Sequence, residues 1–189
     1  MGTISELFDN AEVTPEIQKT FDAIADALEA PFTPHFFQVW AMSPESLEGI
    51  WPVMRHILCG GRVSRRLKEM IFVAISSLKA CHYCQDAHAA FCTNIGVPNE
   101  QIQSLIHNHT IEDGDAKDKA AIDFAIKLAK DSKSGSADDI NHLKSFGYDE
   151  EEIMEIIAMS GMSVFYNHLA DASGIVVDQK FKDILARKI

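Results

Sequence analysis

The chain has 189 residues, of which 47% are hydrophobic and 24% charged, as in an ordinary globular protein with a core of its own. Its formal net charge of -11 at pH 7 argues against nucleic acid and anionic membrane surfaces as partners, because both attract a basic protein face. The first ten residues lack the regions of a secretion signal, and the longest apolar run, 70–75, is too short to span a bilayer. We therefore expect a cytoplasmic protein that binds neither membrane nor nucleic acid.

The sequence predicts helices almost throughout and no strand of useful length. Three helix starts share one signal, a hydroxyl-bearing cap followed by proline: Thr14-Pro15, Thr33-Pro34 and Ser43-Pro44. Pro31 should end the first of these helices and Gly60-Gly61 the third. Pro52 should kink the third helix or split it in two, because proline removes a helical hydrogen bond.

A helix over 65–79 follows, and its body is apolar on nearly every side, so it should form the buried centre of the fold. A break near Ala80 separates it from a helix over 81–95, which Gly96 ends. Five further helices are expected, over 98–106, 116–131, 137–146, 149–172 and 180–187. The whole chain, 1–189, is predicted to be a single all-α domain.

Chemistry-bearing side chains gather at the start of the helix over 81–95. At about 100° per residue, Cys81, Cys84, His88 and Cys92 share one face. Free amides and the dipole at a helix start favour a thiolate. Two neighbouring sulfurs can form a disulfide, and His88 lies one turn beyond Cys84, within reach of its proton. The pattern therefore predicts a redox-active cysteine pair.

Glu69 can join this group only if the chain turns back. On one continuous helix it would lie about 22 Å from Cys84. If the chain reverses near Ala80, Glu69 falls beside His88 at the edge of a strongly apolar run. Partial burial would then raise its pKa toward the range of a general base, giving a Glu–His–Cys proton relay.

Zinc binding and plain packing are the alternatives for the cysteines. The spacing of Cys81, Cys84, His88 and Cys92 superficially matches a zinc knuckle. However, these residues span about 16 Å on a continuous helix, and ligands on one straight face cannot surround an ion tetrahedrally. We favour redox chemistry with no metal and no cofactor, and we read Cys59 and Cys92 as packing residues.

The pattern Arg65-Arg66-Leu67-Lys68-Glu69, an apolar helix, and then Cys81-His82-Tyr83-Cys84 with His88 resembles the alkylhydroperoxidase D (AhpD)-like, carboxymuconolactone decarboxylase superfamily. Residues 167–172 are similar to the close of the domain in its peroxidase-related branch, and the resemblance covers about 30–175. It implies an AhpD-like multihelical domain with a central antiparallel hairpin that carries the cysteine pair. It also implies a homo-oligomer, often a trimer or hexamer.

The resemblance further implies reduction of alkyl hydroperoxides through a dithiol/disulfide cycle, with a thiol or dithiol as the reductant. Cys84 would be the peroxidatic thiol, Cys81 the more exposed resolving thiol, and Glu69 and His88 the proton relay. One position departs from the pattern: Tyr83 stands where the best-known peroxidase has a histidine, and His82 comes one place earlier.

Three other functions are weighed beside peroxide reduction. The first two are a non-enzymatic redox switch, whose oxidation alters assembly or partner binding, and a disulfide reductase. A decarboxylase of the carboxymuconolactone type is less favoured, since that branch generally lacks the cysteine pair. His168 is a further residue of interest, because the segment 167–171 is expected to approach the site.

Overall fold

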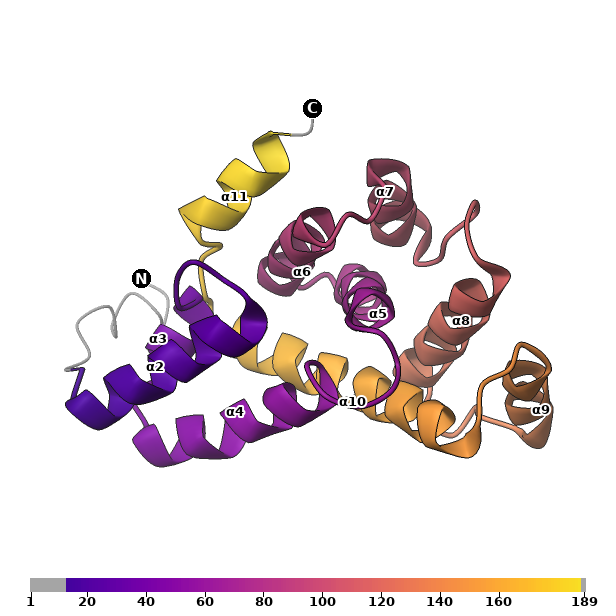
Figure 1. Cartoon of the computed structure of the whole chain (residues 1–189), viewed down its shortest axis with the longest axis horizontal. Helices are drawn as coiled ribbons and strands as arrows, with labels where there is room; N and C mark the ends of the chain where they lie inside the picture. Colours follow the sequence, from indigo (N-terminus) through magenta and orange to yellow (C-terminus); the bar gives the residue numbers. More distant parts are fainter. Residues whose placement is uncertain (1–12, 188–189) are drawn as a thin grey trace.

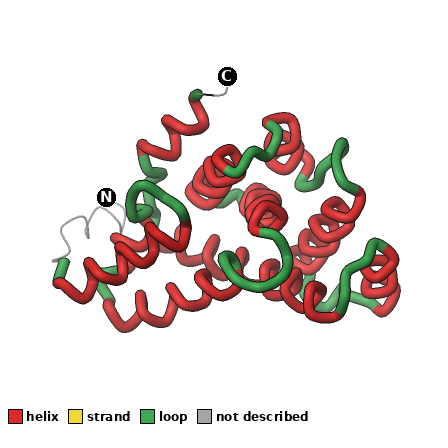
Figure 2. The backbone as a smooth tube through the Cα atoms, in the orientation of Figure 1, coloured by secondary structure: helices red, strands yellow, loops and turns green. Residues whose placement is uncertain are grey.

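The computed structural model describes residues 13–187, and in this range the chain forms helices and no strand (Figures 1 and 2). The helices are α2 (Pro15–Leu28), α3 (His35–Trp40), α4 (Pro44–Ile57), α5 (Arg65–Leu78), α6 (His82–Asn94), α7 (Asn99–Asn108), α8 (Ala116–Lys130), α9 (Ala137–Ser145), α10 (Glu150–Ser173) and α11 (Gln179–Ala186). The predicted all-α class is confirmed. None of these helices is long and apolar enough to cross a membrane. The ten residues searched for a secretion signal lie outside the described range.

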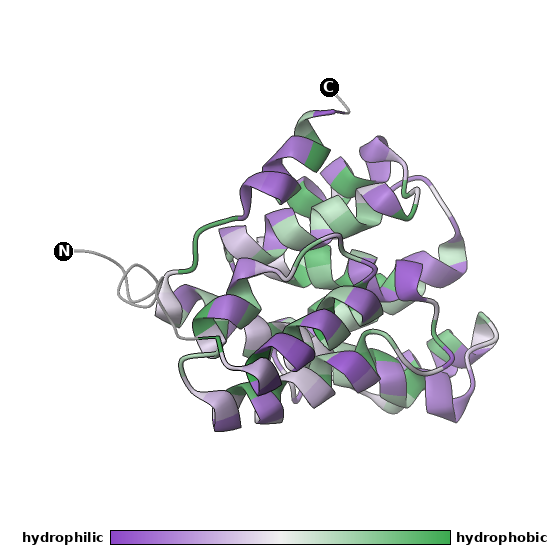
Figure 3. Cartoon of the chain, turned by 60° about the vertical axis from the view of Figure 1, so that its left-hand side comes forward, coloured by the Kyte–Doolittle hydropathy of each residue, from purple (hydrophilic) through white to green (hydrophobic). Residues whose placement is uncertain are grey.

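Helix α5 lies at the centre of the molecule, with α6, α7, α8 and α10 packed around it (Figure 1). Every residue from Leu67 to Ser76 is buried, as its apolar body predicts. The hydrophobic segments gather toward the middle of the molecule and the hydrophilic ones face outward (Figure 3). Two of the buried residues are charged, and each has an opposite charge beside it: Lys68 pairs with Glu155 at 2.7 Å, and Glu69 pairs with Arg65 at 2.5 Å.

Side-chain caps fix several helix starts, but of the three predicted cap–proline pairs only Thr14 forms its capping hydrogen bond, while Thr33 lies outside α3 and Ser43 caps no amide. The Thr14 hydroxyl accepts a hydrogen bond from the Ile17 amide at the start of α2, and Ser64 does the same at the start of α5. Ser136 and Asp149 each form a capping box, at α9 and α10.

Helix α4 runs unbroken from Pro44 to Ile57, so of the two predicted effects of Pro52, a kink or a split, the split does not occur. Proline removes one amide donor, which leaves the carbonyl of Glu48 without its helical partner. Both Pro52 and Glu48 are exposed, so water can bind that carbonyl and the helix continues.

The chain reverses between α5 and α6 at Ala80, which has a left-handed φ of 58°. The turn is closed by a hydrogen bond from the Cys81 amide to the Ser76 carbonyl, at 2.9 Å. Helix α6 then returns beside α5, which places Arg65 over the ring of Phe91, 5.8 Å from its centroid. The early turns of α5 therefore face the middle of α6.

Candidate active site

Cys81 and Cys84 lie at the start of α6, where Cys81 is the N-cap and Cys84 belongs to the first turn. Both thiols are free, and Cys81 lies near enough to Cys84 to contribute to the raised pKa of its thiol. Cys81 is 1% exposed and Cys84 3% exposed. The expectation that Cys81 is the more exposed of the two is therefore wrong, because the turn at Ala80 tucks it against the end of α5.

The surroundings of Cys84 favour the protonated thiol. Burial, the hydrogen bond and charge of Cys81, and the charge of Asp171 raise the pKa of Cys84 well above its usual value. Burial thus outweighs the stabilisation of a thiolate expected at a helix start. The contribution of Asp171 shows that the end of α10 approaches the site, although His168 itself is exposed. Cys84 consequently needs a base before it can act as a nucleophile.

Cys84 and His88 line a narrow cavity of about 30 Å³. Most of its wall is aromatic and comes from helices far apart in the sequence: Phe36, Phe37, Phe72, Tyr83, Phe91, Tyr166 and Phe181. A cavity of this volume holds one molecule of about the size of water. Water therefore fits beside the thiol without any rearrangement of the wall, and hydrogen peroxide is the hydroperoxide nearest to it in size.

His88 is held in a fixed orientation by Glu69 and Phe72, and Arg65 in turn holds Glu69. Its Nδ1 lies 2.5 Å from Oε2 of Glu69, across the α5–α6 contact. Arg65 donates to the other oxygen of Glu69 from its Nε, at 2.6 Å. The ring of Phe72 stacks on the imidazole at 3.5 Å and 13°. With Nδ1 engaged, Nε2 is the ring nitrogen suited to exchange a proton with a group in the cavity.

Glu69 is fully buried, yet it is an ionised carboxylate at neutral pH. Burial raises its pKa, but the charges and hydrogen bonds of His88 and Arg65 outweigh burial and bring the pKa below the ordinary value of 4.5. The prediction of a raised pKa is wrong, because it left out the combined effect of these two partners. Glu69 is suited to orient His88 and to stabilise its protonated form rather than to take a proton itself.

Tyr83, the position that departs from the family pattern, joins three segments around the cavity. Its hydroxyl accepts a hydrogen bond from the Phe36 amide at 3.1 Å and donates one to Asp178 at 3.0 Å. Asp178 also accepts from the amide of His35, at 3.0 Å. Burial raises the pKa of Asp178, although these hydrogen bonds oppose the rise. His82 is exposed and takes no part in this arrangement.

Replacing Tyr83 by phenylalanine should destabilise the fold by about 1–3 kcal/mol, because it leaves the buried Phe36 amide without a partner and removes one of the hydrogen bonds to the half-buried Asp178. Urea unfolding of the variant and the wild type measures this difference. Tyr148→Phe is the matched control, since that hydroxyl makes one longer hydrogen bond, to the Lys117 carbonyl at 3.3 Å. Equal losses of stability in the two variants would show that the hydrogen bonds of Tyr83 stabilise the fold no more than that of Tyr148.

The two remaining cysteines lie beside the site. Cys92 is completely buried, and burial raises its pKa well above the usual value. Cys59 is half-buried and accepts a hydrogen bond from Arg65 at 3.1 Å, so it contacts the arginine of the Arg65–Glu69 ion pair. Among residues 13–187, no group of three or more His, Cys, Asp or Glu side chains is placed to hold a metal ion.

Known structures share this fold over most of their length. A peroxidase-related protein from Silicibacter sp. TM1040 superposes with a TM-score of 0.82 at 24% identity, over 91% of this chain and 90% of that one. The alkylhydroperoxidase AhpD core of a peroxidase-related protein from Ralstonia eutropha JMP134 gives 0.81 at 23% identity, over 89% and 88%. The debrominase Bmp8 gives 0.75 at 20% identity, over 94% and 97%. The fold is therefore AhpD-like.

Residues 44–127, which span α4 to most of α8, match the model of the carboxymuconolactone decarboxylase family. This segment includes Glu69, Cys81, Cys84 and His88. Over residues 44–127 the chain is similar to the carboxymuconolactone decarboxylase family, and its fold is AhpD-like, so the resemblance found in the sequence is confirmed.

Proposed function

We propose that this protein is a thiol-dependent oxidoreductase that reduces hydroperoxides through a Cys81–Cys84 dithiol/disulfide cycle. One observation carries the proposal: the Cys84 thiol shares an apolar cavity with His88, whose Nδ1 is held by buried Glu69. A nucleophile and an oriented base thus line one small cavity, and the second thiol, Cys81, lies near the nucleophile at the start of the same helix.

The cycle begins when His88 takes the Cys84 proton through Nε2, which compensates for the raised pKa of the thiol. The thiolate attacks one peroxide oxygen, the O–O bond breaks, and the leaving alkoxide or hydroxide receives the proton from His88. Cys84 is now a sulfenic acid. The Cys81 sulfur condenses with it, releases water and forms the disulfide, and an external thiol or dithiol then supplies two electrons and two protons to restore both thiols.

A count of thiols before and after peroxide treatment tests this cycle. The chain has four cysteines, all free. One equivalent of hydrogen peroxide should lower the thiol count of the denatured protein from four to two, and peptide mapping should link Cys81 to Cys84. The Cys92→Ser variant should fall from three to one. A count that stays at four, or a disulfide through Cys59 or Cys92, contradicts the proposed cycle.

We place the cycle in the cytoplasm, where cellular dithiols keep cysteines reduced and can return electrons to the disulfide. Four free thiols agree with such a compartment. Dithiothreitol serves as the reductant for assays.

Reductive debromination is a second candidate, suggested by the aromatic lining of the cavity and by the complex of Bmp8 with 2,3,4-tribromopyrrole. Two thiols and an aryl bromide would give the disulfide, the debrominated ring and hydrogen bromide. The cavity of about 30 Å³ favours the peroxide, since a brominated ring enters only if the aromatic wall moves. Bromide release from 2,3,4-tribromopyrrole with dithiothreitol, beside a hydroperoxide assay, decides between the two.

A non-enzymatic switch based on the same disulfide predicts a different outcome. Turnover with hydroperoxide and dithiothreitol would be slow, while oxidation would change the size of the assembly. Sedimentation of the reduced and oxidised protein separates the switch from the enzyme.

A further inference from the structure

Helix α10 has an exposed face that nothing in residues 13–187 covers. It carries no charged residue from Ile156 to Asn167. Met154 is 63% exposed and Phe165 43% exposed, and both are among the largest apolar side chains open to solvent in the described chain. A helix that is apolar on its outer side as well as its inner side is typical of one that packs against a further element.

The outward positions of α10 follow the spacing of a coiled-coil seam. They alternate steps of three and four residues: Glu151, Met154, Ala158, Gly161, Phe165 and His168. We call these six residues the α10 seam. Ala158 is half-buried and the other five are exposed, so the seam is one continuous stripe along the outer side of the helix. Such a stripe fits the seam of a second helix.

The chemistry of the α10 seam is symmetric about a point between residues 159 and 160. In an antiparallel pair with the same helix of a second copy, Ala158 lies opposite Gly161 of the partner subunit. Met154 then lies opposite Phe165 of the partner subunit, and Glu151 opposite His168 of the partner subunit. Small residues meet small, large apolar residues meet large apolar, and a carboxylate meets an imidazole. This is the self-complementarity that a two-fold interface requires.

We propose that α10 is the site where two copies of this chain associate, with their α10 seams antiparallel about a two-fold axis. The centre of the seam permits close approach, since a Cβ added to Gly161 would meet no atom within 4 Å. Small residues at a crossing let two helix axes approach to about 8 Å. Antiparallel packing also sets the two helix dipoles in opposite directions.

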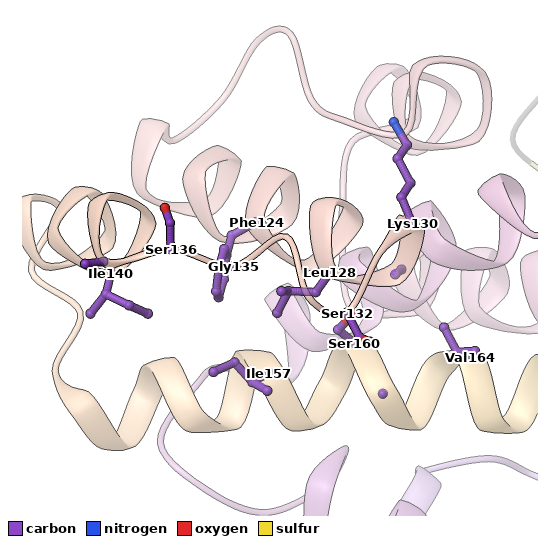
Figure 4. A pocket seen from close by; sticks show the side chains of 13 residues that line it. Phe124, Leu128, Lys130, Ser132, Gly135, Ser136, Ile140, Ile157, Ser160 and Val164 are labelled. Atoms are coloured by element: carbon purple, nitrogen blue, oxygen red, sulfur yellow. The ribbon is translucent and has the colours of Figure 1, made fainter.

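A hollow beside the seam extends the apolar surface that a partner covers. It lies between α8, α9 and α10, has a volume of about 740 Å³, and shares Gly161 with the seam. Figure 4 shows Ile157 and Val164 of α10 pointing into it from one side, with Leu128 and Ile140 on the other, while the Lys130 amine points away. The wall is thus apolar where it adjoins the seam.

Glu151 is placed to accept a hydrogen bond from the imidazole of His168 of the partner subunit. In its own chain it already binds Arg62, at 3.1 Å, which holds the carboxylate at the end of the seam. His168 can donate a hydrogen bond to a carboxylate whether its ring is neutral or protonated. The two polar ends therefore fix the register of the pair while the apolar centre supplies the contact.

Sedimentation equilibrium of two variants, alone and mixed, tests the proposal. Wild-type protein at about 10–50 µM should sediment as a dimer or a larger even-numbered assembly. Met154→Glu and Phe165→Lys each put two charges against apolar side chains of the partner, so each variant alone should have at most half the wild-type mass. Val53→Glu, at an exposed apolar residue of α4, is the matched control and should keep the wild-type mass.

An equimolar mixture of Met154→Glu and Phe165→Lys should recover the wild-type mass. In the mixed pair Glu faces Lys on one side of the axis and native Phe faces native Met on the other. This recovery also excludes misfolding as the cause of dissociation. A monomeric wild type, a Met154→Glu variant of unchanged mass, or a mixture that stays dissociated each overturns the proposal.

Discussion

Serine in place of Cys84 will abolish the reduction of hydroperoxide, whereas serine in place of Cys81 will permit one oxidation and no more. A serine hydroxyl does not attack the O–O bond, so the first variant should lose on the order of 10³-fold or more in rate. In the second variant Cys84 still reacts, but its sulfenic acid has no neighbouring thiol. The measurement for Cys84→Ser is hydroperoxide consumption with excess dithiothreitol. The measurement for Cys81→Ser is trapping of its sulfenic acid by a dimedone probe after one equivalent of hydroperoxide, with no thiol added.

Cys92→Ser is the control for both variants. Cys92 lies on the same helix and is as buried as the pair, but it is not among the residues lining the cavity. Its variant should keep hydroperoxide turnover near the wild-type rate. Full turnover by Cys84→Ser, or an oxidised Cys81→Ser variant that gives no dimedone adduct at Cys84, would contradict the proposed cycle.

Glutamine in place of Glu69 should lower both stability and activity by large amounts. The change removes the negative charge between Arg65 and His88 at a fully buried position. Breaking a buried ion pair costs about 3–5 kcal/mol, and the low end applies because the Arg65 side chain is 26% exposed. Loss of the charge that stabilises protonated His88 should reduce the rate about 100-fold. Urea unfolding and hydroperoxide turnover measure the two effects.

The same variant should also change how stability depends on pH. The folded pKa of Glu69 lies below its ordinary value of 4.5, so the unfolded chain takes up the proton first as the pH falls. The stability from Glu69 is complete above about pH 4.5 and is lost as the pH drops through the folded pKa. Glu69→Gln removes that part of the dependence of stability on pH.

Asp123→Asn is the control for Glu69→Gln, because Asp123 forms a pair of the same spacing with Lys119 on an exposed face of α8. Its stability and its pH slope should stay near those of the wild type, since an exposed ion pair contributes little. Equal changes in stability and in its pH dependence for the two variants would show that burial does not strengthen the ion pair of Glu69.

The sequence predicted the helices well because the signals that define them are local. Caps such as Ser64 and Asp149, and the apolar body of α5, act within a few residues. The placement of Glu69 beside His88 could also be anticipated, since it needs only a reversal at Ala80. Whether Pro52 kinks α4 or splits it was left open by the sequence, because the exposure of the helix face, which lets the helix continue, is decided by neighbours that a local pattern does not contain.

The electrostatics of the site were beyond prediction from spacing alone. The pKa of Glu69 depends on Arg65 and His88 acting together against burial, and the balance could not be settled without their distances. Asp178, which holds Tyr83, is 95 residues away from it, and no local signal joins the two. The burial of Cys81 likewise follows from the turn that packs it on α5.

The wall of the cavity has a practical consequence for handling the chain. Helix α11 contributes Phe181 to that wall. Asp178, the residue that precedes this helix, accepts the hydrogen bond of the Tyr83 hydroxyl next to Cys84. A shortened version that ends before residue 178 would keep every residue of the family segment 44–127 and still lose one side of the cavity next to Cys84. Boundaries for expression should therefore be drawn from the packing of the C-terminal helix and not from the family match.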